Sequence, residues 1–157
     1  MNNEILSTKQ IVSLTGISSQ KLHYWMLKQV FVPYDPSSGT GTTRRFTFQN
    51  LLEISIAKTL ILEGLTIDRV SAILDSIRKK ASDCFDKTLQ RPKLPENDKI
   101  LCIRFGVNNP KTAVINIYTL KTAKEKLDIL FASRPHVSLL NLDKLKADLV
   151  HKLSVLD

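Results

Sequence analysis

The chain has 157 residues, of which 43% are hydrophobic, and its formal net charge at pH 7 is +8. This length suits one domain or two small ones, and the apolar fraction excludes an intrinsically disordered chain. No apolar run approaches the ~18 residues of a membrane-spanning helix, and the N-terminus lacks the features of a signal peptide, so we expect a cytoplasmic protein. The positive charge suits a polyanionic partner.

Two short helices are predicted near the N-terminus. Ser7 and Gln10 stand three residues apart and form a capping box that opens the first helix. Gly16 ends that helix, because glycine adopts a positive φ at little cost. Ser18 can then cap a second helix that runs from residue 19 to about residue 28. This spacing predicts a helix-turn-helix, whose second helix can enter a DNA major groove.

A wing is predicted after the second helix. Residues 30–33 form a short apolar segment that we expect to be extended, and residues 35–43 form a loop rich in Pro, Gly, Ser and Thr. Residues 44–46 close the loop. An extended arm, a Gly-rich tip and a return arm together predict a β-ribbon.

Two longer helices follow the wing. Thr47 can cap a helix that runs to Glu63 and is apolar on most sides, which predicts a central position in the first core. Gly64 ends it, and Thr66 can cap a fourth helix. That helix carries an amphipathic stripe of Val70, Ile73, Leu74 and Ile77. Its basic end, residues 78–80, complements the helix dipole.

The rest of the chain predicts a small ββαβα unit. Residues 91–98 contain two prolines and few apolar side chains, so they are the expected linker. Two β-rich runs flank a turn at 108–111, and they are followed by a helix from Thr122, a third strand at 137–142 and a terminal helix with a leucine stripe. The predicted fold class is α+β. A winged helix-turn-helix domain, mostly α with a β wing, occupies 1–90, and an α+β domain for dimerisation or sensing occupies 99–157.

Four short motifs resemble the winged-helix DNA-binding domain of the mercury-resistance-regulator (MerR) family of bacterial transcription factors. They are Leu14-Thr15-Gly16-Ile17-Ser18, Leu22-His23-Tyr24-Trp25, Arg44-Arg45-Phe46-Thr47 and Leu60-Ile61-Leu62-Glu63-Gly64-Leu65. Their order and spacing hold over residues 6–77. The resemblance implies a DNA-binding transcriptional regulator in which Arg44 occupies the position of the family's wing arginine.

The chain departs from that family at three places. The arginine of the family's recognition helix falls on His23, and the tyrosine of its wing falls on Phe46, so affinity and specificity are expected to differ. Family members continue into a long dimerising helix, whereas here the helical pattern fades after Lys80. We therefore expect a homodimer held by the C-terminal domain. Either the edge strand of its hairpin or the leucine stripe of the terminal helix would form the contact.

The candidate DNA contacts lie on the second helix and the wing. Lys21 is favoured as a contact to guanine or phosphate, whereas Gln20 is equally compatible with reading adenine and with an ordinary solvated position. Trp25 is expected to pack as a core anchor. Of the two wing arginines, strand alternation should point only one fully toward DNA. The predicted DNA-binding residues are Ser18, Gln20, Lys21, His23, Tyr24, Thr43, Arg44 and Arg45.

Nothing in the sequence indicates a catalytic, metal or cofactor site. Cys84 and Cys102 have no CxxC or histidine spacing and are interpreted as small hydrophobic residues, with Cys84 kept as a minor candidate for a metal or redox role because it lies near the expected domain junction. Arg104 is expected to share a half-exposed strand face with Ile100 and Cys102. No phosphate-binding glycine motif or catalytic triad pattern is present, so an enzyme is not expected.

Three functions remain compatible with these patterns. The leading one is a sequence-specific regulator that binds double-stranded DNA. The second is an architectural DNA-binding protein similar to phage or plasmid excisionases, against which the length of the C-terminal domain argues. The third is a protein-interaction adaptor that has kept the fold and lost DNA contact, as His23 and Phe46 would allow.

Overall fold

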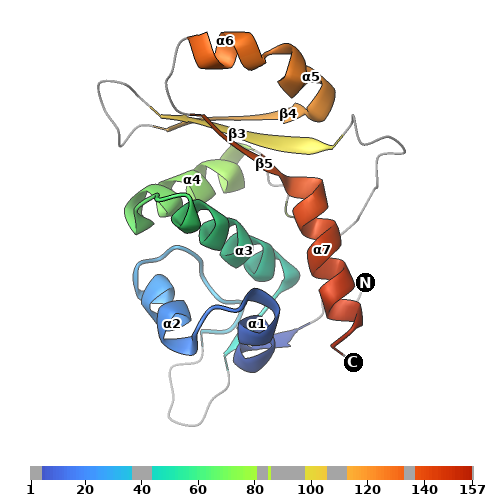
Figure 1. Ribbon diagram of the computed structural model, residues 1–157. Helices are drawn as coiled ribbons and strands as arrows, with labels where there is room; N and C mark the ends of the chain where they lie inside the picture. Colours follow the sequence, from blue (N-terminus) through green and yellow to red (C-terminus); the bar gives the residue numbers. More distant parts are fainter. Residues whose placement is uncertain are drawn as a thin grey trace.

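The computed structural model describes residues 5–36, 44–80, 85, 98–105, 113–132 and 137–156. Figure 1 shows a helical N-terminal part joined to a small sheet with flanking helices, in agreement with the predicted α+β class. The N-terminal elements are β1 (Leu6–Ser7), α1 (Thr8–Thr15), α2 (Ser19–Leu27), β2 (Arg45–Phe46), α3 (Phe48–Leu62) and α4 (Ile67–Lys80). The C-terminal elements are β3 (Lys99–Phe105), β4 (Ala113–Thr119), α5 (Leu120–Glu125), α6 (Leu127–Ala132), β5 (Val137–Asn141) and α7 (Leu142–Ser154).

The predicted starts of α1 and α2 and the predicted stop of α1 are confirmed. The Ser7 hydroxyl accepts a hydrogen bond from the Gln10 amide at 3.3 Å, and the Gln10 side chain accepts one from the Ser7 amide at 2.9 Å. The Ser18 hydroxyl caps α2 by accepting a hydrogen bond from the backbone amide of Lys21 at 3.3 Å. Gly16 has a φ of 67°, so the turn between α1 and α2 requires the left-handed region that glycine enters most easily.

The wing differs from the prediction in its pairing. Residues 30–33 are not a strand; instead, β1 pairs antiparallel with β2, and Asp35 pairs with Arg45 through two backbone hydrogen bonds of 3.2 Å. The physical reason is that side chains already occupy the carbonyl groups of Val30 and Val32, and that Pro33 has no amide hydrogen to donate. The expected tip of the wing, with Thr43, lies outside the described residues.

Helix α3 lies at the centre of the N-terminal core, as its apolar character predicted (Figure 1). Leu51, Leu52, Ile54 and Leu60 are fully buried although they point in different directions around the helix. The stripe of α4 that was predicted from Val70 to Ile77 is also fully buried. Helix α3 is therefore the scaffold against which α1, α4 and α7 pack.

The C-terminal part is a three-stranded antiparallel sheet in the order β4-β3-β5. Helices α5 and α6 cover one face, and α4 and α7 lie on the other side (Figure 1). The expectation of a half-exposed β3 is wrong for Ile100 and Cys102, whose exposed fractions are 4% and 0%. The reason is that β3 is the central strand and α5 packs over it.

One apolar cluster crosses the predicted boundary between the two domains. Leu101 and Ile103 from β3 belong to it together with Trp25 and Leu51 from the N-terminal part. The leucine stripe of α7 also packs into this cluster, so it is used within the chain and is not a free dimer surface. None of the helices in the described ranges is long and apolar enough to cross a membrane.

Candidate DNA-binding surface

Helix α2 separates its residues sharply into a buried and an exposed side. Leu22 and Trp25 are almost completely buried, which confirms Trp25 as a core anchor. Gln20, Lys21, His23 and Tyr24 are exposed, and Ser18 is exposed just before the helix. The side chains of this helix that are predicted to contact DNA therefore all face outward. The opposite side of the helix packs against the core.

Two lysines of this region stack over aromatic rings. The Lys21 ammonium lies 5.7 Å from the centroid of the Trp25 ring, and the Lys28 ammonium lies 5.9 Å from that of Tyr24. These distances are within the range of cation–π attraction. The contacts hold both ammonium groups beside their rings, and such ordering would reduce the conformational entropy lost on binding an anion.

The wing arginines differ in exposure. Arg45 is exposed on β2, and its backbone is fixed between Ser7 and Asp35, whereas Phe46 is fully buried against Phe31. Arg44 is half-buried. The predicted alternation thus makes Arg45 the outward side chain, while Arg44 stands at the position of the family motif. The burial of Phe46 places the ring of this residue in the core.

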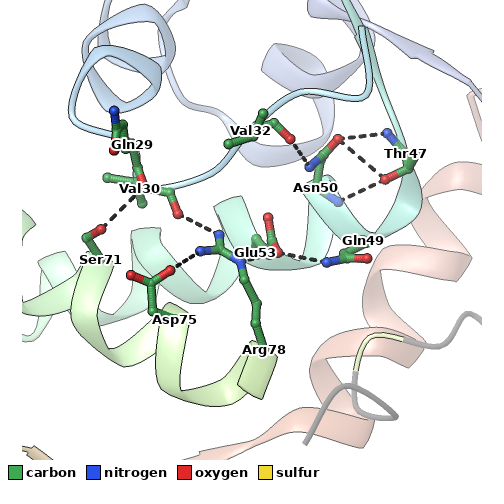
Figure 2. Close-up of polar contacts among 10 residues, drawn as sticks. All are labelled: Gln29, Val30, Val32, Thr47, Gln49, Asn50, Glu53, Ser71, Asp75 and Arg78. Carbon is green, nitrogen blue, oxygen red and sulfur yellow. Dashed lines mark hydrogen bonds and ion pairs between the residues drawn. The ribbon is translucent and has the colours of Figure 1, made fainter. Parts of the chain in front are cut away.

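A polar network beneath this surface fixes the segment between α2 and the wing (Figure 2). Arg78 of α4 donates through Nη2 to the carbonyl oxygen of Val30 at 2.7 Å, and Asn50 of α3 donates to that of Val32 at 2.8 Å. Ser71 donates to the carbonyl of Gln29 at 3.3 Å. Side chains from α3 and α4 therefore satisfy three carbonyls of a segment that has no ladder partner of its own.

Arg78 also balances the charge of a buried carboxylate. Glu53 is only 2% exposed, and its Oε1 accepts hydrogen bonds from Arg78 Nε at 2.9 Å and from Gln49 at 3.0 Å. Asp75 accepts a further hydrogen bond from Arg78 at 2.6 Å. Burial alone would lower the pKa of Arg78, but the hydrogen bonds and charges of Glu53 and Asp75 outweigh it, so the pKa is raised. Arg78 stays cationic.

Sequence patterns missed this network. The position of Arg78 at the end of α4 suggested a charge that complements the helix dipole. The available signal was Glu53, a carboxylate inside a helix that is otherwise apolar on most sides. Such a residue needs a partner when it is buried.

Comparison with known proteins concerns the same part of the chain. Residues 6–77 match the family described as "MerR HTH family regulatory protein". Uncharacterized HTH-type transcriptional regulators from Mycobacterium bovis and Mycobacterium tuberculosis are 28% identical to this chain over 68 residues. The aligned segment covers 43% of this chain and 30% of each relative. The match coincides with the capped helices, the wing base and the helix pair described above. Residues 6–77 are therefore a helix-turn-helix domain of the MerR family.

Proposed function

We propose that the chain is a transcriptional regulator that binds double-stranded DNA in a sequence-specific manner. The observation that carries this proposal is the exposed side of α2, which presents Gln20, Lys21 and His23 from a MerR-type helix-turn-helix. The names of the matched relatives, which are HTH-type transcriptional regulators, support the same function.

In this proposal α2 enters the major groove, as second helices of helix-turn-helix units do. Gln20 and Lys21 contact base edges, since an amide suits adenine and an ammonium suits guanine. Ser18 fixes the N-terminus of α2, whose free amides and partial positive charge favour a phosphate. His23 and Tyr24 contact the backbone at the flank of the groove.

The wing supplies contacts to the phosphate backbone. Arg45 is the outward-facing guanidinium, and Arg44 and Thr43 complete the set toward the tip. A guanidinium is suited to a phosphate because its planar fork offers two parallel N–H donors. Such contacts fix the register of the protein on the duplex without reading its sequence.

We also propose that the chain acts as a homodimer joined through the C-terminal unit. The α7 stripe is already buried within the chain, so the edge of β4 is the surface left among those that the sequence suggested. An edge strand has backbone groups that can pair across a two-fold axis.

Selection of bound duplexes from a random-sequence pool tests both proposals with the full chain. We expect an enriched site made of two inverted half-sites about one helical turn apart, because a two-fold dimer reads a two-fold operator. Binding without any enriched sequence would identify the architectural mode instead, and enrichment of a lone half-site would contradict the dimer.

The same selection separates base contacts from phosphate contacts. Gln20→Ala and Lys21→Ala should change the preferred bases, whereas Arg44→Ala and Arg45→Ala should weaken binding to all sequences by a similar factor. Lys121→Ala is the matched control, because it removes one exposed charge from α5, which lies beyond the sheet from α2 (Figure 1). If the four variants alter only thermal stability, the assigned contacts are wrong.

A further inference from the structure

The face of the C-terminal sheet beneath α5 and α6, here the outer face, brings polar and apolar side chains together. In the register of the sheet, Cys102 stands opposite Asn116, and Arg104 stands opposite Val114. Leu139 of β5 lies on the other side of Cys102. Because directly opposite residues in an antiparallel pair point to the same face, these side chains share the outer face.

Burial supports this division of the two faces. Leu101, Ile103 and Ile115 belong to the large apolar cluster of the chain, so they define the inner face. Ile100 and Cys102 are also buried but stand outside that cluster. They therefore pack on the outer face with α5.

Two buried donors on the outer face lack a hydrogen-bond acceptor. Among the described residues, neither Arg104 Nε nor Asn116 Nδ2 has a partner, although both atoms are removed from solvent. Native structures leave few such atoms unsatisfied, because a buried donor without an acceptor has lost its hydrogen bonds to water and formed none within the protein. The two residues are diagonal neighbours on adjacent strands. Side chains at diagonal positions can be close enough for one small molecule to contact both.

Arg104 also lacks a counter-ion in the described part of the chain. Glu53 and Asp75 form ion pairs with Arg78. Asp98 and Asp143 lie at the opposite end of β3 from Arg104 and have other partners, since Asp98 accepts from Asn141 and Asp143 accepts from the Lys99 amide. Cys102 cannot be the counter-ion of Arg104 at neutral pH, because burial raises the pKa of its thiol and keeps it protonated.

The surroundings of the two donors are apolar and partly open. Cys102, which is directly opposite Asn116, is fully buried, whereas Val114 is 45% exposed and Leu139 is 39% exposed. The end of the outer face that carries Arg104 and Val114 therefore has an exposed apolar side chain beside the buried donors. It offers apolar contact next to two N–H donors that have no acceptor.

We propose that the outer face binds a small carboxylate with an apolar body. The carboxylate oxygens accept hydrogen bonds from Arg104 Nε and Asn116 Nδ2, and the apolar body packs against Val114 and Leu139. A carboxylate fits because it accepts from two donors at once and neutralises one guanidinium. The apolar flanks disfavour a doubly charged, fully hydrated anion such as phosphate. This site is independent of DNA binding by α2.

Side-chain NMR of the full chain tests the proposal directly. The Arg104 Nε–H and Asn116 amide signals are followed in ¹H–¹⁵N spectra during titration with sodium benzoate, acetate, benzamide and inorganic phosphate. We expect benzoate to shift both signals saturably, with an affinity at least about tenfold above those of acetate and phosphate, which corresponds to about 1.4 kcal/mol. Benzamide, which is planar but neutral, should bind at least as weakly as acetate.

Variants distinguish specific benzoate binding at Arg104 and Asn116 from non-specific binding elsewhere on the chain. Arg104→Met should abolish the benzoate response, and Asn116→Leu should do so without lowering the melting temperature, because it removes a donor that has no acceptor. Lys121→Met removes one positive charge, as Arg104→Met does, but from an exposed residue of α5. It should leave the benzoate affinity unchanged. If Arg104→Met does not fold, Arg104→Lys keeps the charge, lacks the Nε–H donor and should still weaken benzoate binding at least about fivefold. No saturable response in the parent chain, or undiminished affinity in the Arg104 variant, would overturn the proposal.

Discussion

Arg78 connects three parts of the N-terminal domain through one guanidinium. It donates hydrogen bonds to Glu53 of α3, to Asp75 of its own helix, and to the carbonyl of Val30 in the segment that leads from α2 to the wing. The positions of the proposed recognition helix and of the wing therefore both depend on this side chain (Figure 2).

Replacing Arg78 by Met should lower the free energy of unfolding by about 3 kcal/mol, because Glu53 would remain buried and uncompensated. Urea denaturation followed by Trp25 fluorescence measures this change. The double variant Arg78→Met/Glu53→Gln should recover part of the loss, since it removes the buried charge as well. A stability of the single variant within 0.5 kcal/mol of the parent, a margin typical of surface changes, would contradict the assigned role.

The turn between α1 and α2 sets the angle of the helix-turn-helix. Gly16 has a φ of 67°, and a Cβ added there would meet only the Lys58 ammonium at 3.7 Å, which is an ordinary contact. The cost of Gly16→Ala therefore comes from the backbone, and we expect a loss of about 1–2 kcal/mol in stability.

Thermal denaturation of Gly16→Ala and Gly16→Asn compares two side chains in this conformation. Gly16→Asn should lose less stability than Gly16→Ala, because asparagine tolerates the left-handed region better than alanine does. Equal stability of both variants and the parent would show that the turn does not require glycine.

The elements show how much of the fold local sequence determines. Caps and end glycines are local signals, so Ser7, Ser18 and Gly16 predicted the starts and stops of α1 and α2 correctly. The arm at 30–33 was predicted wrongly, because its hydrogen bonds go to side chains from α3 and α4 that no local pattern reveals.

The same limit applies to the candidate site. Helical periodicity indicated which residues of α2 face outward, and strand alternation indicated that only one wing arginine does so fully. The roles of Glu53 and Arg78 depend on packing between helices that are distant in sequence. The burial of β3 depends on α5, so alternation along one strand was insufficient for Ile100 and Cys102.

At the scale of the whole molecule, the N-terminal and C-terminal parts share one apolar cluster. Leu149 of α7 is 3% exposed in that cluster, so Leu149→Ala should cost about 2–5 kcal/mol. Because the core is continuous, the unfolding transition reported by Trp25, in the other half, should shift by the same amount as the transition in far-UV circular dichroism.

Val155→Ala provides the control for this prediction, because Val155 lies at the end of the same helix but is 72% exposed. It should change stability by less than about 0.5 kcal/mol. A Trp25 transition that stays unchanged in Leu149→Ala, while the circular dichroism transition moves, would mean that the two parts unfold independently.

DNA binding by the surface of α2 and the wing is the central claim, and the salt dependence of affinity tests it most directly. Fluorescence anisotropy of a labelled duplex, titrated with the full chain at several salt concentrations, gives the binding constant. We expect nanomolar to micromolar dissociation constants and a linear fall of log affinity with log salt, because each phosphate contact releases counterions. Arg45→Ala should reduce the slope by about 1. Absence of binding, or an affinity that stays flat between low and physiological salt, would contradict the account.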